Sequence, residues 1–419
     1  MSPPRASIRI DALAAPVLTD FQKAALAWGE KNPVTFREDV VLDAARRRTG
    51  LADFGPDDFR ARLRVWLAAV EDDRGLHPLG RHGVFQSCVR YLANRLRFTD
   101  LWQQHPEIAE IEIERPIIVV GMPRSGTTHL VNLIAADTRL RSLPYWESLE
   151  PVPVPGEGPG RDGRDPRWLR CQRSYEMQVA QAPLVVAMHD MPPEHIHEEI
   201  ELMELDFGSY QLEWLCRPPR WRHFYLSLDA HPHYAYLKRV LQALTFLRGP
   251  RRWVLKSPQH LEQLVPLRDT FPDATIAITH RDPVSVIRSA ITMLGYGDRM
   301  RRSELDLEGL AAYWIDRVER LLRACVRDRE KLPAEHSIDV PFDEFMADDL
   351  AMVGRIYQQA GLELTPRARG ELERFMAGSP RGKHGQVVYD LARDFAVDPR
   401  EVRERFAFYF ARFPVRVES

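Results

Sequence analysis

The chain has 419 residues, long enough for one large domain with a substantial extension or for two domains. Hydrophobic residues make up 44% and charged residues 28% of it, as in an ordinary globular protein, which excludes disordered, collagen-like and coiled-coil classes. With 58 basic and 60 acidic residues the net charge is −2, so no global basic excess points to nucleic acid or an anionic membrane.

The sequence also bears on the compartment. The first residues lack the basic and then apolar layout of a signal peptide, and apolar runs such as residues 117–120 are far shorter than a bilayer span. We therefore expect a cytoplasmic protein with no transmembrane segment. The cysteines form no paired CxxC spacing, which favours reduced buried thiols over a disulfide framework or a zinc site: Cys88, Cys171, Cys216 and Cys325.

Residues 1–112 are predicted to form an α-helical extension. Apolar residues recur at helical spacing between Phe59 and Val70, and the same spacing returns between Cys88 and Leu96. No pattern that indicates chemistry is found in this segment. We therefore expect a helical layer beside the domain that carries the function.

An α/β domain is predicted over residues 113–419. The all-apolar run at residues 117–120 is typical of a strand buried in a parallel sheet. Two further buried strands are expected at residues 253–255 and 274–279, separated by a helix that starts after Pro258. This βαβ spacing predicts a parallel sheet flanked by helices.

Other segments complete this outline. Residues 151–167 contain five prolines and four glycines, which exclude a helix or a central strand and predict a surface loop or lid. Residues 198–247 read as mostly helical and rich in aromatic side chains. A long amphipathic helix is expected at residues 307–331, a short strand at 337–340, and helices after residue 349.

The strongest functional pattern is the stretch GMPRSGTT at residues 121–128. A glycine-rich turn between a buried strand and a helix N-terminus directs several backbone N–H groups at one point, which attracts phosphate. The spacing is that of GxxxxGK[ST], but Thr127 stands where the lysine belongs and Arg124 enters the loop. No later strand ends in an acidic residue placed to hold Mg²⁺, so we expect a phosphorylated nucleotide other than ATP-Mg.

The motif PRSGTT after a strand resembles the 5′-phosphosulfate-binding loop of sulfotransferases that use 3′-phosphoadenosine 5′-phosphosulfate (PAPS). The resemblance covers roughly residues 116–397. It implies an α/β fold with a P-loop-like nucleotide site, PAPS as co-substrate and no metal. It also implies donor contacts from Arg124, Ser125, Gly126, Thr127 and Thr128.

A second stretch, residues 274–289, looks like the 3′-phosphate site of the same family. There an arginine at a strand end and a serine eight residues further on grip the phosphate, and Arg281 and Ser289 have this spacing. Arg281 offers a forked set of donors to phosphate oxygens, and Ser289 adds a hydroxyl. The family's C-terminal basic glycine loop resembles residues 381–385, in a different residue order, which implies a contact from Arg381.

The resemblance further implies the catalytic groups. In this superfamily the corresponding strand ends in a lysine that contacts the bridging oxygen of the phosphosulfate, which points to Lys256. Cytosolic relatives carry a histidine base two residues later, where this chain has Pro258. The branch that resembles tyrosylprotein and bacterial PAPS sulfotransferases takes its base from a glutamate after the P-loop helix. Glu147 is therefore the expected base, and Glu150 is close enough to compete.

Two clusters favour a structural interpretation. A group of histidines and glutamates lacks the i, i+4 histidine pair of a helical metal site, so we interpret it as a polar loop and helix start. It comprises His189, His195, His197, Glu198 and Glu199. An aromatic run can line an acceptor pocket, although half or more of such residues belong to a core. It comprises Trp214, Trp221, Phe224, Tyr225, Tyr234, Tyr236 and Phe246.

We therefore predict sulfuryl transfer from PAPS to an acceptor hydroxyl or amine on a small molecule or lipid. One alternative is a P-loop kinase, which Thr127 disfavours. The other is a non-catalytic nucleotide-binding or scaffold protein, against which Glu147 and Lys256 argue. Composition does not separate phenols, sterols, lipids, glycans and peptides as acceptors.

Overall fold

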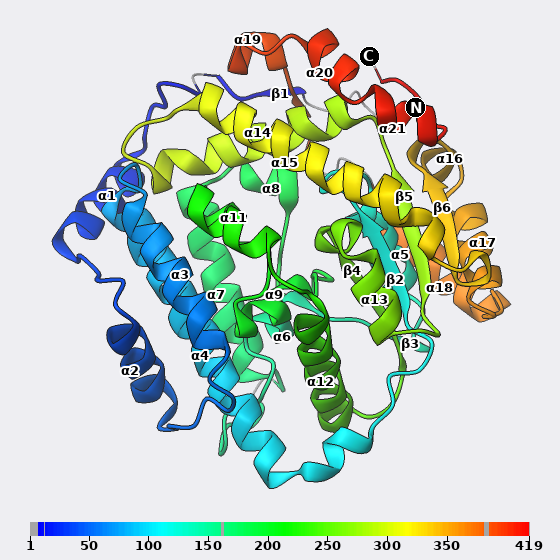
Figure 1. The fold of residues 1–419 in the computed structure, drawn as a ribbon, viewed down its shortest axis with the longest axis horizontal. Coiled ribbons are helices and arrows are strands. Elements are labelled where there is room, and N and C mark those ends of the chain that lie inside the picture. Colours follow the sequence, from blue (N-terminus) through cyan, green and yellow to red (C-terminus); the bar gives the residue numbers. More distant parts are fainter. Residues whose placement is uncertain (1–6, 12, 161–162, 381–384, 419) are drawn as a thin grey trace.

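A parallel sheet lies within the computed structural model, which describes residues 7–11, 13–160, 163–380 and 385–418. In this part of the chain five strands form it in the order β3-β4-β2-β5-β6, and every neighbouring pair is parallel (Figure 1). The predicted α/β fold with a parallel sheet is confirmed. The strands are β2 (Ile117–Gly121), β3 (Leu140–Arg141), β4 (Arg252–Ser257), β5 (Thr275–His280) and β6 (Ser337–Pro341).

Each face of the sheet packs against its own hydrophobic core. On β2, Ile118 and Val120 belong to the larger core, whereas Ile117 and Val119 belong to the smaller one. Because successive side chains of a strand point to opposite faces, a strand covered on both sides is apolar throughout. The smaller core is completed by α5 (Thr127–Ala135), α16 (Phe342–Ala347), α17 (Asp349–Gln359) and α18 (Pro366–Gly378).

The N-terminal segment forms a helical layer, drawn in blue in Figure 1. Its apolar side chains belong to the same larger core as β2, so the layer and the sheet share one hydrophobic interior. Asp206 links the two parts through polar bonds, because Arg62 and Arg95 of the layer donate to its carboxylate at 2.6 and 3.0 Å. The layer consists of α1 (Asp20–Lys31), α2 (Glu38–Thr49), α3 (Phe59–Asp72) and α4 (Pro78–Gln104).

The long connection from β3 to β4 is largely helical. Its first part, residues 151–160 and 163–165, contains no helix or strand, as its prolines and glycines predict. The helices of this connection are α6 (Tyr145–Leu149), α7 (Pro166–Gln181), α8 (Val185–His189), α9 (Ile200–Met203), α10 (Leu212–Leu215), α11 (Pro219–Leu226) and α12 (His231–Arg248).

After β4 the chain forms a 3₁₀ turn at Pro258–Glu262 and then α13 (Leu264–Thr270), where a helix directly after Pro258 was expected. Two long helices follow β5 and cross the top of Figure 1, namely α14 (Pro283–Arg301) and α15 (Leu307–Asp328). The chain ends with α19 (Leu391–Phe395), α20 (Pro399–Arg405) and α21 (Ala407–Arg412).

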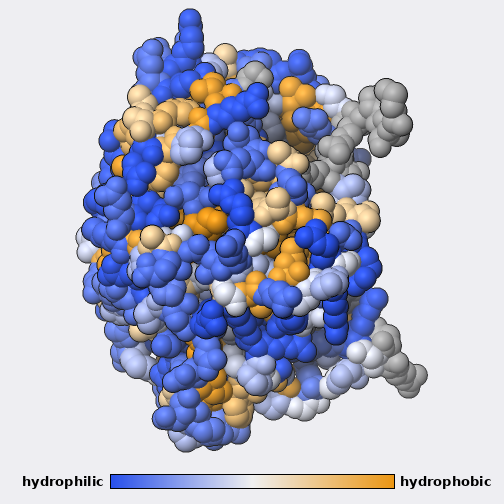
Figure 2. Space-filling model, turned by 90° about the vertical axis from the view of Figure 1, so that its right-hand side faces the viewer, coloured by the Kyte–Doolittle hydropathy of each residue, from blue (hydrophilic) through white to orange (hydrophobic). Residues whose placement is uncertain are grey.

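Three short strands were not predicted, namely β3 in the sheet and two that lie far apart in the sequence. β1 (Ser7–Arg9) pairs in parallel with β7 (Gln386–Val388), which places the start of the described chain beside its C-terminal part. The four cysteines are buried and free, as expected. No described helix is long and apolar enough to cross a membrane. Figure 2 shows a mainly hydrophilic face with separate apolar patches.

Candidate active site

The P-loop-like turn joins β2 to α5 at the carboxyl edge of the sheet. A Cβ atom on Gly121 would lie 1.9 Å from the hydroxyl oxygen of Thr279, so only glycine fits there. Gly126 has a φ of 89° and turns the chain into α5. The first amides of a helix have no acceptor within the helix, so the turn presents backbone donors to an anion.

The side chains of this turn divide into two groups. The hydroxyl of Ser125 is buried; it donates to the carbonyl of Met122 at 2.6 Å and lies 2.7 Å from the hydroxyl of Thr279. Ser125 therefore ties the turn to β5. The other predicted side chains of the turn line a cleft, namely Arg124, Thr127 and Thr128.

Arg124, Arg281 and Ser289 meet in one cluster. The Nε atom of Arg124 donates to the hydroxyl of Ser289 at 2.9 Å, and Arg281 donates to the carbonyl of Arg124 at 2.6 Å. Arg124 adopts a φ of 70°, a left-handed conformation that costs about 1–2 kcal/mol. These bonds hold the strained residue, so two stretches separated by 157 residues form one polar surface.

The remaining donors of Arg281 are occupied by a carboxylate from the end of the chain. Its Nε and one terminal nitrogen each donate to an oxygen of Glu418 at 2.7 Å. The backbone N–H of Glu418 donates to Asp282 at 2.9 Å, which fixes the tail beside α14. An anionic group therefore already lies on the arginine that was predicted to bind a phosphate.

Lys256 lies on β4 beside Val119 of β2, close to the P-loop-like turn. Only 1% of its side chain is exposed, and its ammonium forms an ion pair with Glu198. A buried ammonium is costly without such a partner. Glu198 itself lines the cleft, so this ion pair lies at the cleft wall.

A chain of buried polar groups supports Lys256 from behind. Its backbone N–H donates to Glu199 at 2.7 Å, and the other oxygen of Glu199 lies 2.7 Å from Nε2 of His260. The Nδ1 atom of His260 is 2.6 Å from the hydroxyl of Tyr234. Every member is buried, so the chain fixes the end of β4 where Lys256 lies.

Three histidines lie next to this ion pair. The rings of His189 and His195 are 5.4 Å apart, and those of His195 and His197 are 6.2 Å apart. Burial, together with neighbouring positive groups that include Lys256, holds the pKa of His189 and His195 well below 6.5. Both imidazoles are therefore neutral at neutral pH.

The cleft has a volume of about 420 Å³ and extends from the turn to α14. Its polar end contains Arg124, Thr127, Thr128 and Glu198. Its other walls come from α7, α8, α10, α14 and the loops beside them, and they are mainly apolar: Val185, Met191, Trp214, Leu215, Met293, Leu294 and Met300. Polar side chains also line these walls, namely Gln178, Gln181, His189, His197, Gln211 and Arg301.

Glu147 lies away from this cleft. Its carboxylate forms ion pairs with Arg141 at 3.2 Å and Arg248 at 2.8 Å. Arg141 pairs with Trp253 in the sheet, three residues before Lys256, which is a distance of about 10 Å along a strand. Glu147 therefore belongs to the opposite end of β4.

The other predicted residues are also located. Glu150 forms an ion pair with Arg170 at 2.7 Å and does not line the cleft. Arg381 lies outside the described residues. Of the aromatic run, Trp214 lines the cleft, whereas Trp221, Tyr225 and Tyr234 are buried in the larger core. Within the described chain, no group of three or more histidine, cysteine and acidic side chains is arranged to hold a metal ion.

Comparisons with known proteins agree with this geometry. The model of the sulfotransferase family matches residues 116–366, more than half of the chain. The chain belongs to the sulfotransferase family. No match was found among curated proteins.

Two solved sulfotransferases resemble the chain over most of their length. STF1 from Mycobacterium tuberculosis H37Rv is 29% identical, with 89% of this chain and 98% of that one covered and a TM-score of 0.78. STF9 from Mycobacterium avium is 25% identical, with 92% and 98% covered and a TM-score of 0.82. The predicted family is confirmed, while its tyrosylprotein branch stays a prediction.

The residue of this sulfotransferase that sequence reasoning missed is Glu198. It appeared only within a histidine-rich stretch that we interpreted as a polar loop. Its partner Lys256 is 58 residues away, so no local spacing connects the two. The available signal was the pair of glutamates at residues 198 and 199, directly before an apolar helix start.

Proposed function

We propose that this sulfotransferase moves a sulfuryl group from PAPS to an acceptor hydroxyl or amine in the cleft. The observation that carries the proposal is the ion pair of Lys256 and Glu198 at the cleft wall, beside the P-loop-like turn. There the ammonium of Lys256, which can stabilise a leaving phosphate, contacts the carboxylate of Glu198, which can accept a proton. Lys256 lies on β4, and Glu198 lies in the loop before α9, where its neighbour Glu199 accepts the backbone N–H of Lys256.

The donor site fits a nucleotide with phosphate at both ends. The turn offers the first amides of α5 and the side chains of Arg124, Thr127 and Thr128, which suits the phosphosulfate. Arg281 binds a carboxylate through two parallel bonds, the geometry with which arginine also binds phosphate. The hydrogen-bond donors of Arg281 therefore support the proposal that a 3′-phosphate binds at Arg281 and Ser289.

In the proposed reaction PAPS supplies an electrophilic sulfur with 3′,5′-ADP as its leaving group. Glu198 accepts the proton of the acceptor hydroxyl while the acceptor oxygen bonds to sulfur. Lys256 stabilises the electron pair that stays on the bridging oxygen as the sulfur–oxygen bond breaks. We assign the base to Glu198 in place of Glu147, because Glu147 lies outside the cleft between two arginines.

A set of variants tests the assignment. Glu198→Gln is expected to keep the binding of 3′,5′-ADP but to lower kcat by ~10²–10⁴-fold, the usual contribution of a positioned base. Lys256→Met is expected to lower kcat as well, because the leaving group loses its cation. Glu147→Gln serves as the control: it lowers the melting temperature by breaking buried ion pairs, while the folded fraction keeps its kcat.

His189 is the competing base, because its neutral imidazole also lines the cleft. If His189→Gln or Glu147→Gln abolishes turnover while Glu198→Gln does not, the assignment to Glu198 is wrong. Binding of 3′,5′-ADP is compared with that of 5′-AMP by thermal shift. Equal stabilisation by the two nucleotides would count against the 3′-phosphate site at Arg281.

A further inference from the structure

We infer that the acceptor is an apolar small molecule with one reactive hydroxyl, an inference that rests on the proposed function. Beyond the polar end, the cleft is walled mainly by aliphatic, aromatic and thioether side chains, with fewer polar ones such as Gln178 and Gln181. Among them are Trp214 on α10, and Met293 and Met300 on α14. Such a wall stabilises an apolar ligand through the surface that is removed from water.

The charges of the cleft argue against cationic and sugar acceptors. Among the described residues that line it, the carboxylate is that of Glu198, which Lys256 already neutralises. Arg301 at the far end is held by Asp298 and by the carbonyl of Trp214. Glu198 is the proposed base at the reacting end, and no other described lining residue is anionic, so an ammonium group further along the cleft finds no partner. The remaining walls are mainly apolar with fewer polar side chains such as Gln178, Gln181 and Gln211, so several hydroxyls of a sugar would lie against groups that cannot bond to them.

The size and composition of the cleft add to the argument. A volume of about 420 Å³ is in the range of sites for small molecules. Met191, Met293 and Met300 have flexible side chains that adapt to ligands of different shape. We therefore expect tolerance toward the apolar part of the acceptor and strict demand for a hydroxyl at the polar end.

A series of 4-alkylphenols tests this inference. With each methylene group that enters the cleft, kcat/KM is expected to rise about fourfold, from the ~0.8 kcal/mol gained per buried methylene. The 4-hydroxyphenyl glucoside and tyramine, which carry the same phenol with a sugar or an ammonium, are expected to react poorly. Met293→Gln is expected to flatten the dependence on chain length, whereas the exposed Met177→Gln leaves it unchanged.

Binding without donor, measured by thermal shift, separates the two levels of the argument. Alkylphenols that bind with this dependence but are never sulfated would support the acceptor class and overturn the proposed transfer. Sulfation of glucoside, tyramine and alkylphenols alike, without dependence on chain length, would overturn the acceptor class and leave the transfer intact. Folding of Met293→Gln is checked by its binding of 3′,5′-ADP.

A second, independent observation concerns the tail. We propose that Glu418 competes with the 3′-phosphate of the nucleotide for Arg281. Its carboxylate takes two donors of Arg281, and its backbone is held by Asp282 and, at 3.3 Å, by Arg403. The tail is therefore seated on the predicted phosphate site by bonds of both side chain and backbone, and Arg281 must exchange partners when the nucleotide binds.

Removal of the competing charge provides the test. Glu418→Gln is expected to tighten 3′,5′-ADP binding by about three- to tenfold, because the binding-competent state becomes more populated. Binding of 5′-AMP, which has no 3′-phosphate, should not change. The exposed Glu404→Gln changes the net charge equally and should affect neither nucleotide.

Limited trypsin digestion supplies a second readout. Arg416 is exposed even with the tail bound, but release of the tail frees its backbone to enter the protease, so 3′,5′-ADP should speed cleavage there and 5′-AMP should not. Equal effects of Glu418→Gln on both nucleotides, or none on either, would overturn the competition. If the two nucleotides bind equally in every variant, the 3′-phosphate assignment itself is wrong.

Discussion

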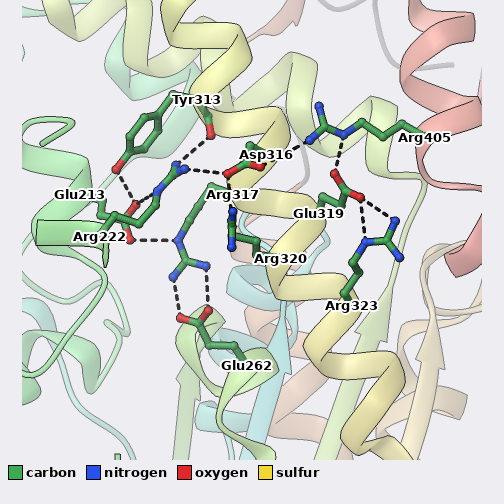
Figure 3. A network of polar contacts seen from close by, with 10 residues as sticks. All are labelled: Glu213, Arg222, Glu262, Tyr313, Asp316, Arg317, Glu319, Arg320, Arg323 and Arg405. Carbon is green, nitrogen blue, oxygen red and sulfur yellow. Dashed lines mark hydrogen bonds and ion pairs between the residues drawn. The ribbon is translucent and has the colours of Figure 1, made fainter. Parts of the chain in front are cut away.

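Replacement of Arg317 provides the most direct test of how this fold holds its active-site strand. The side chain of Arg317 on α15 is completely buried and bridges Glu213 on α10 and Glu262, which ends the turn after Lys256 and Ser257 (Figure 3). It donates to Glu213 at 2.9 Å and to the two oxygens of Glu262 at 2.7 and 2.5 Å.

Arg317→Met keeps much of the side-chain volume but removes the charge. Glu213 keeps its ion pair with Arg222, whereas in the described chain Glu262 keeps only a hydrogen bond from the neutral hydroxyl of Tyr225. A buried charge that has lost its partner costs about 3–5 kcal/mol. At ~2.1 cal/mol/K per residue, the 419-residue chain unfolds with an entropy of ~0.9 kcal/mol/K, so the melting temperature should fall by about 3–6 °C.

A double variant shows whether charge is the cause. The double variant with Glu262→Met removes both charges and should recover stability, because an apolar pair can replace a buried ion pair. A double variant as unstable by calorimetry as Arg317→Met alone would refute the reasoning.

Three further predictions concern titration and metal dependence. Burial holds the pKa of His195 well below 6.5, so on acidification this imidazole is protonated first in the unfolded chain. The melting temperature should therefore fall as the pH drops below 6.5. The same dependence of melting temperature on pH in His195→Gln would contradict this. Burial raises the pKa of Glu204 well above 4.5, so the stability should fall as the pH rises from 4.5 to this raised pKa. Glu204→Gln should remove this fall, as melting curves at several pH values would show. Sulfate transfer should survive EDTA; loss that Mg²⁺ restores would favour the kinase alternative.

The sequence could bring together the residues proposed to bind the nucleotide, because their signals are local. Gly121 to Thr128 form a turn whose spacing is visible in the sequence, and Arg281 follows β5 with Ser289 eight residues further on in α14. The carboxyl ends of parallel strands meet at one edge, so local signals on neighbouring strands converge in space. The hydroxyl of Ser125 bonds to the loop and to β5, which no spacing in the sequence indicates.

The remaining features depend on contacts that no local pattern records. β1 and β7 are three-residue strands that pair across almost the whole chain, so neither is long enough to show a periodicity. Glu147 and Glu198 both follow aromatic or histidine-rich stretches, and only the fold shows which one lies in the cleft. The opposite ends of β4 separate them, because Glu147 contacts Arg141 near its start and Glu198 contacts Lys256 near its end.

The two proposed sites have the same electrostatic arrangement, a cation paired with a carboxylate. Lys256 and Arg281 are cations that a nucleotide with two phosphate ends requires, and in the described chain a carboxylate accompanies each of them. Without Glu198, the buried ammonium of Lys256 would be uncompensated, at a cost of several kcal/mol. In the proposed binding step Lys256 and Arg281 exchange these carboxylates for phosphate, so that Glu418 leaves Arg281 while Glu198 stays at the cleft wall. Glu198 thus compensates the charge of Lys256 before the donor binds. On the proposed function, the same carboxylate then becomes free to take the proton of the acceptor hydroxyl.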